Sequence, residues 1–128
     1  MKGQLSLEFL VLVFMCTAFF LFILPNVNAL KEAGDYALNL GNAELILDKF
    51  AYACERVLIT NSREALVVHA LTNYSVSRKQ GKTFLFFRRV SEIKHASKPT
   101  PCAFEVGEIA QGRNEFSVEF EDERAVVK

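Results

Sequence analysis

An apolar run near the start of the chain restricts the fold more than any other feature. From Phe9 to Leu24 all 16 residues are apolar except Thr17, and no charged residue lies between Glu8 and Lys31. With Gln4–Glu8 before it and Pro25 after it, the run reaches about 22 residues, and the hydrocarbon core of a bilayer needs roughly 20 helical residues. Because a helix that is apolar on every face lies in a protein core or in lipid, the run predicts a helix that spans a membrane.

Two simpler interpretations of the run stay open. A secretory signal peptide has a basic start, a shorter apolar core and a small-residue cleavage site, and a cut after Ala29 would release an exported soluble domain. Glu8 argues against this, because ordinary signal peptides place no acid between the basic start and the apolar core. A plain membrane anchor, with Glu8 at the interface, is the second: an acid costs about 2.5–3.5 kcal/mol at the centre of a spanning helix and less near its end.

The residues around Glu8 form a pattern of their own. Gly3, Gln4, Ser6 and Glu8 stand directly before the hydrophobic run. This arrangement resembles the class III signal sequence of archaeal type IV pilin-like proteins, in which a short basic leader ends in Gly or Ala and the mature chain begins Gln-x-Ser-x-Glu. The resemblance implies that a prepilin peptidase cuts between Gly3 and Gln4 on the cytoplasmic side, so that the helix is kept.

The resemblance also implies a role for Glu8 in assembly. Cleavage frees an α-amine on Gln4, which is largely protonated at neutral pH. In a filament, where the helices bundle and water leaves, Glu8 of one copy can pair with the Gln4 amine of a neighbour. A buried charge left unpaired is costly, so the pair would fix axial register more than it adds stability. Gln4, Ser6 and Glu8 are therefore the expected assembly residues.

A break and then an amphipathic helix are expected after the run. Pro25 lacks a backbone donor and clashes with the preceding turn, which predicts a kink or a melted stretch. Gly34 followed by Asp35 predicts a restart with Asp35 as N-cap. Apolar residues then recur at alternating steps of four and three, on one helical face: Tyr36, Leu40, Ala43, Leu47, Phe50, Cys54 and Val57. Ile46, Ala53 and Leu58 widen this face. A helix packed on its own sheet is favoured, because a coiled coil with another chain needs more heptads.

The remainder of the chain has the character of short strands. Asn73–Arg78 and Thr83–Arg89 flank a turn at residues 79–82, a hairpin signal in which Gly81 can take a positive φ. Alternation at 116–121 predicts another strand, which turns at Asp122-Glu123 into residues 124–127. Pro99 and Pro101 predict a loop before a strand at 102–106, and residues 65–71 fit either a strand or more helix. We expect four or five antiparallel strands.

These elements predict an α+β fold, in which a long N-terminal hydrophobic helix, kinked near Pro25, is followed by a small antiparallel β head packed on the helix's second half. The expected domain organisation is a leader peptide at 1–3, a transmembrane or filament-core helix at 4–25, an extracellular amphipathic segment at 26–60 and the β-rich head at 61–128.

Two covalent modifications are predicted for the head. The chain has three cysteines, and because Cys16 lies in the apolar run as a small hydrophobe, Cys54 and Cys102 are left as a candidate disulfide. Such a bridge would add on the order of 4 kcal/mol in the chain-entropy model. Two unpaired buried cysteines are the alternative. Asn73-Tyr74-Ser75 is an N-glycosylation sequon, which makes Asn73 a glycosylation candidate.

Charge is balanced overall but segregated along the chain. The 15 Lys and Arg residues equal the 15 Asp and Glu residues, so nothing points to a nucleic-acid partner. Residues 78–98 are basic and residues 105–123 are acidic. The favoured interpretation is cross-strand complementarity within one head. The alternatives are a basic face that meets an acidic face of the next subunit, and a binding patch for anionic surfaces or glycans.

No pattern of catalysis or cofactor binding appears in the sequence. His69 and His95 lack metal-ligand spacing, and there is no phosphate loop or nucleophile motif. We therefore expect no enzyme activity and no cofactor.

The expected function is a pilin or minor pilin of an archaeal type IV pilus-like filament, for adhesion or surface attachment. Its expected partners are prepilin peptidase, further copies or related pilins, and the membrane before assembly, with the N-terminus cytoplasmic and the head extracellular. The alternative is a single-pass anchored extracellular binding module that never polymerises.

Overall fold

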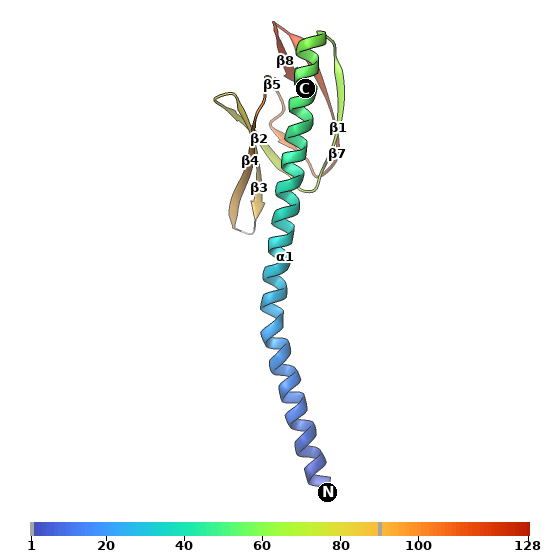
Figure 1. Cartoon of the computed structure of the whole chain (residues 1–128), viewed down its shortest axis with the longest axis vertical. Helices are drawn as coiled ribbons and strands as arrows, with labels where there is room; N and C mark the ends of the chain where they lie inside the picture. Colours follow the sequence, from blue (N-terminus) through green and yellow to red (C-terminus); the bar gives the residue numbers. More distant parts are fainter. Residues whose placement is uncertain (1, 90) are drawn as a thin grey trace. The chain divides into compact units, whose positions relative to one another are not determined.

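A computed structural model describes residues 2–89 and 91–128 (Figure 1). One long helix precedes eight strands in this part of the chain. The elements are α1 (Lys2–Thr60), β1 (Glu64–Ala70), β2 (Tyr74–Lys79), β3 (Lys82–Arg89), β4 (Glu92–Pro99), β5 (Cys102–Phe104), β6 (Glu108–Ile109), β7 (Gly112–Glu121) and β8 (Arg124–Val127). The chain divides into two compact units, Met1–Asp35 and Tyr36–Lys128. The fold is α+β, as predicted, with β-sheets packed on the part of α1 that follows the apolar segment.

The N-terminal unit is helical through Pro25, and the predicted melted stretch with a restart at Asp35 is wrong. Proline removes one backbone hydrogen bond, but the surrounding turns keep theirs and hold the helix together. The neighbouring side chain also helps, because Asn26 donates from Nδ2 to the carbonyl oxygen of Phe22 at 2.9 Å. Asp35 is therefore a residue inside the helix rather than its N-cap.

The C-terminal unit consists of two four-stranded sheets packed against the second half of α1. The strand order is β1-β7-β8-β5 in one sheet and β4-β3-β2-β6 in the other. In Figure 1 the helix has β1 and β7 on one side and β2, β3 and β4 on the other. Most neighbouring strands are antiparallel, but β5 pairs with β8 in parallel. The expectation of four or five strands, all antiparallel, was therefore too low in number and wrong for this pair.

The core of this unit lies between the helix and the two sheets. The predicted helical face is confirmed: Ala43, Leu47, Phe50, Cys54 and Val57 are buried, and Tyr36 and Leu40 are partly buried against them. Strand residues complete the core, among them Val68, Tyr74, Leu85, Phe87, Val118 and Val127. The period of 3.6 in the helix thus places one stripe against the alternating faces of both sheets.

Two tight turns follow the sequence prediction. The β2–β3 hairpin turns at Gln80 and Gly81, whose φ angles are 52° and 76°. The β7–β8 hairpin turns at Asp122 and Glu123, with φ angles of 48° and 62°. Two consecutive positive φ angles match the twist of antiparallel strands, which fixes the register of both hairpins.

The segregated charges do not complement each other across neighbouring strands, so the favoured interpretation was wrong. The basic segment runs from the end of β2 through β3 and β4 of one sheet, whereas Glu115, Glu119 and Glu121 of the acidic segment lie in β7 of the other. Lys94 pairs with Glu92 of its own strand, and Lys98 pairs with Asp48 of the helix. In the described residues, the ion pairs of Glu119 are with Arg63 and Lys128. The order of charges along the sequence could not predict this arrangement, because it does not show which strands pair and the two segments belong to different sheets.

Candidate functional site

The N-terminal unit exposes many large apolar side chains. Phe9, Phe14 and Phe22 expose 69%, 73% and 75% of their surface. The helix holds an 18-residue window with a mean hydropathy of 2.7, none of it covered by other parts of the chain. By length and composition it is long enough and apolar enough to cross a membrane. Soluble monomers rarely expose apolar patches of more than a few hundred Å².

The predicted processing and assembly residues lie in the first turns of this helix. Gln4, Ser6 and Glu8 are exposed, and Gly3 has no neighbouring atom within 4 Å of where a Cβ would lie. Glu8 borders a shallow hollow of about 350 Å³ whose other walls are Leu7, Val11, Leu12, Met15 and Cys16. A carboxylate is thus held at the edge of an otherwise apolar surface, one turn after Gln4.

Two polar side chains in the apolar segment donate a hydrogen bond to the backbone of their own helix, which sequence reasoning did not predict. Thr17 donates from Oγ1 to the carbonyl oxygen of Val13 at 2.8 Å, and Asn26 bonds Phe22 in the same way. Bonds of this i to i−4 kind let polar residues lie in an apolar environment without another partner. A single Thr or Asn inside a predicted apolar helix is the sequence signal for such a bond, because its side chain can reach the carbonyl oxygen four residues earlier.

Cys54 and Cys102 are joined by a disulfide in the structure, with their Cα atoms 5.7 Å apart and a sequence separation of 48. Cys54 lies on the buried face of α1, and Cys102 begins β5. The bridge therefore ties the end of the helix to the edge strand that follows the proline loop. Cys16 is a free and exposed cysteine on the apolar helix.

A hydrogen-bonded cluster around Asn42 ties the helix to the ends of β1 and β2. Asn42 donates from Nδ2 to the carbonyl oxygen of His69 at 2.9 Å, and its Oδ1 accepts from the backbone N–H of Leu71 at 3.0 Å. The Tyr74 hydroxyl lies 2.9 Å from both Oδ1 of Asn42 and the carbonyl oxygen of Asn39, and shares its proton between them. Burial raises the pKa of Tyr74 to about 12. Sequence spacing could not predict this cluster, because the bonded residues are 27 to 35 positions apart.

The glycosylation candidate Asn73 lies on the surface immediately before β2. Its Oδ1 accepts a hydrogen bond from the backbone N–H of Gln111 at 2.7 Å. The residue is exposed, as a glycosylation site must be.

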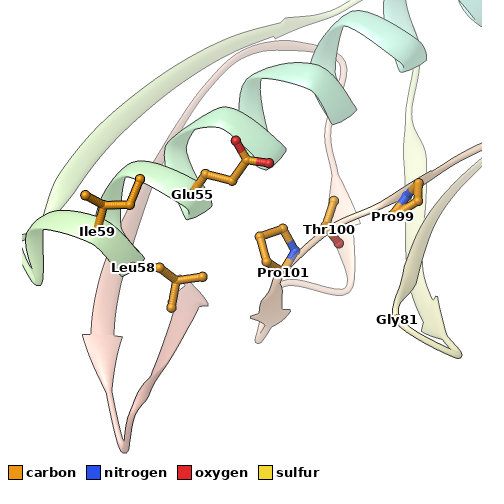
Figure 2. A pocket seen from close by; sticks show the side chains of 7 residues that line it. All are labelled: Glu55, Leu58, Ile59, Gly81, Pro99, Thr100 and Pro101. Carbon is orange, nitrogen blue, oxygen red and sulfur yellow. The ribbon is translucent and has the colours of Figure 1, made fainter.

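A hollow of about 520 Å³ opens at the end of the helix (Figure 2). Leu58 and Ile59 of α1 lie on one side, and Pro99, Thr100 and Pro101 lie on the other. Glu55 is the one ionisable residue among its lining residues. The hollow is therefore mainly apolar and holds no set of groups that could carry out acid–base or nucleophilic chemistry.

Several other ionisable groups of this unit form ion pairs at the surface. Glu121 and then Glu119 raise the pKa of Lys128, and Lys94 lowers the pKa of Glu92 through a hydrogen bond and its charge. In residues 2–89 and 91–128 no three His, Cys, Asp or Glu side chains gather as metal ligands would. His95 instead lies 5.6 Å from the rings of Phe84 and Phe86 on the outer face of β3 and β4.

No protein-family model, curated protein or solved structure matches this chain.

Proposed function

We propose that this chain is a pilin or minor pilin of an archaeal type IV pilus-like extracellular filament. The chain is inserted in the membrane with its head outside and is cut by prepilin peptidase between Gly3 and Gln4. It is then assembled through the hydrophobic segment of α1, and the filament serves adhesion or surface attachment. One observation carries the proposal: an uncovered apolar helix has a carboxylate, Glu8, four residues after the proposed new N-terminus.

The apolar surface of this helix must be covered by something other than water. Its apolar side chains are exposed on every face, so a bilayer or a bundle of like helices must cover them. A bilayer alone does not require Glu8, whereas a bundle gives the carboxylate a partner in the Gln4 amine of a neighbouring copy. The disulfide of the C-terminal unit also favours an exported location, because disulfides persist in oxidising compartments.

Recovery of filaments from variants at Glu8 tests the proposal. The chain is expressed with a prepilin peptidase, and filaments sheared from the cells are compared with chain retained in the membrane. We expect Glu8→Ala to insert normally and to lower filament recovery at least about tenfold, because it leaves the amine of a neighbouring subunit unpaired. Glu32→Ala is the matched control, since Glu32 is an exposed acid of the same helix beyond the apolar run.

Equal filament recovery from Glu8→Ala and Glu32→Ala would contradict the assembly role of Glu8. The second candidate function is an anchored extracellular binding module that never polymerises. The exposed apolar helix is equally compatible with it. A chain that stays in the membrane uncut, and that yields no filaments even without substitution, would favour this second function.

A further inference from the structure

An apolar stripe runs along the exposed side of α1 in the C-terminal unit. Leu38, Leu45, Tyr52 and Ile59 expose 63%, 54%, 62% and 83% of their surface. They are spaced seven residues apart, the heptad spacing that keeps side chains on one side of a helix. The buried residues of the same helix, such as Leu47 and Phe50, lie on the opposite side. Neither sheet of the unit covers the stripe.

Charged side chains flank the stripe in an ordered way. Asp48 and Glu55 each follow a stripe residue by three positions, which places both on one flank. Lys49 and Arg56 follow by four positions, which places both on the other flank. All four side chains are exposed. From Leu45 to Ile59 the stripe thus has an acidic edge and a basic edge, whereas the equivalent positions after Leu38 are the uncharged Gly41 and Asn42.

This asymmetry selects one kind of partner and one orientation. When two identical helices pack in parallel, the flank on one side of the stripe meets the opposite flank of the partner, so acids face bases. When they pack antiparallel, each flank meets its own copy, and like charges face each other. In the parallel arrangement Lys49 faces Asp48 of the second copy, and Arg56 faces Glu55 of the second copy.

We propose that the stripe Leu38–Leu45–Tyr52–Ile59 is a contact surface on which a second copy of this chain packs in parallel. This inference goes beyond the proposed function, because it concerns the C-terminal unit and holds for copies in a membrane as well as in a filament. Copies that share one membrane orientation leave the bilayer with the same polarity, which is the orientation that the charges favour.

Existing ion pairs do not block this contact. Arg56 lies 3.2 Å from Glu64, and Asp48 pairs with Lys98. The side chains of these pairs are 55% and 27% exposed for Arg56 and Glu64, and 54% and 44% exposed for Asp48 and Lys98. Exposed pairs of this kind are weak, so the side chains are free to share a second partner.

The size of the stripe sets the strength of the contact. It covers three heptads, or roughly 32 Å of helix at 1.5 Å per residue. A single row of four side chains covers less than the roughly 800 Å² per partner of a standard interface. The contact is therefore weak in dilute solution and becomes populated where the copies are confined at high local concentration, as in one membrane.

Cysteine cross-linking of the full chain in membranes tests the inference. All variants carry Cys16→Ser, which removes the free thiol, and no prepilin peptidase is present, so that filaments do not form. We expect Leu45→Cys to form disulfide-linked dimers under mild oxidation at least about tenfold faster than Ser77→Cys, since effective concentration rises steeply at a contact. Ser77 is an exposed control on β2, away from the stripe.

Mixed variants determine the orientation. In an antiparallel pair Leu38 of one copy lies beside Ile59 of the other, whereas in a parallel pair these positions are at opposite ends. Preferential cross-linking between Leu38→Cys and Ile59→Cys chains would overturn the parallel arrangement. Equal rates for Leu45→Cys and Ser77→Cys would overturn the contact itself.

A charge exchange tests the role of the flanks. Lys49→Glu alone and Asp48→Lys alone, each added to Leu45→Cys, place like charges opposite each other and are expected to slow cross-linking by about two- to fivefold. A mixture of the two chains restores opposite charges on both sides and should restore the rate of the mixed dimer. No recovery in the mixture would contradict the pairing. If these tests fail and the chain still forms filaments normally in a separate expression with prepilin peptidase, the proposed function stays intact and this inference alone is rejected.

Discussion

The two halves of α1 differ in their apolar pattern and in what covers them. Residues 9–24 are all apolar except Thr17 and present apolar side chains on every face, and the apolar window of this half is not buried. From Tyr36 onward the apolar residues follow a period of 3.6, and the face they form is buried by two sheets of the same chain. Here a single row, Leu38, Leu45, Tyr52 and Ile59, stays exposed on the opposite side.

The difference shows how hydrophobic pattern decides what a helix packs against. A helix with one apolar face can be covered by its own domain, because the polar face stays in water. A helix with no polar face needs an apolar environment on all sides. The second half therefore stabilises the head, and the first half is long enough and apolar enough to cross a membrane.

The largest expected effect contrasts phenylalanines from the two halves. Phe50 is 1% exposed and lies 5.2 Å and 5.4 Å from the rings of Phe104 and Phe116. Phe50→Ala should lower the free energy of unfolding of the head by about 3–5 kcal/mol. Phe14→Ala, at a residue that is 73% exposed, should leave it unchanged. Denaturant unfolding in detergent, followed by near-UV circular dichroism, measures both; equal losses would contradict the division into two units.

The disulfide provides the next contrast. The double variant Cys54→Ser/Cys102→Ser removes the covalent link between two residues with a sequence separation of 48. Because the unfolded chain then gains conformational freedom, the free energy of unfolding should fall by about 4 kcal/mol. Cys16→Ser is the matched control in the apolar half and should have no effect on the head. Thermal unfolding with and without reductant measures the change, and a head that reductant does not destabilise would refute it.

A smaller effect is expected from the polar cluster. Asn42→Ala removes the acceptor of the Leu71 N–H and the donor to the His69 carbonyl oxygen. The expected loss is about 2 kcal/mol in the free energy of unfolding, because two backbone groups lose their partners. Asn26→Ala, which removes only a bond within the apolar helix, should leave the head unchanged. If the two substitutions prove equal, Asn42 does not tie the strands to the helix.

The smallest effect concerns alkaline pH. Burial raises the pKa of Tyr74 from 10.0 to about 12 in the folded state, so between these values the unfolded chain loses this proton and the folded chain keeps it. The unfolded state is thereby favoured, and stability should fall by on the order of 1–2 kcal/mol as pH rises from 10 to 12. Tyr74→Phe should lack this part of the pH dependence. Identical alkaline profiles for the two proteins would contradict it.

The sequence predicted the local features of the fold well. The apolar face from Tyr36 to Val57 follows from helical periodicity, and the hairpin at Gln80-Gly81 follows from turn chemistry. These features depend on residues close in sequence, where spacing and conformational preference decide the structure. The pair Cys54–Cys102 was a candidate because Cys16 lay in the apolar run.

Features that depend on distant residues were not predictable in this way. Strand β4 has Lys94, Ala96 and Lys98 on its inner side and Ile93, His95 and Ser97 on its outer side, so it lacks apolar alternation. Its pairing with β3 makes it a strand. The parallel pairing of β5 with β8 and the Asn42 cluster likewise depend on contacts between remote segments.

The exposed stripe on α1 shows the same limit for the candidate sites. The heptad spacing of Leu38, Leu45, Tyr52 and Ile59 is present in the sequence, but the stronger pattern of the buried face conceals it. Only the position of the sheets shows which of the two apolar rows stays uncovered. Once that row is known to be exposed, the charges at Asp48, Lys49, Glu55 and Arg56 can be interpreted as the flanks of a contact surface.

The mature N-terminus of the membrane-associated protein, determined by mass spectrometry, tests the proposed function most directly. We expect a chain that begins at Gln4 and retains the whole apolar helix, because cleavage after Gly3 precedes that segment. This result would support the prepilin route and the assembly role of Glu8. A mature chain that begins near Leu30, or one that keeps Met1, would contradict it, and Glu8 would then be an interfacial acid of a signal peptide or of a simple anchor.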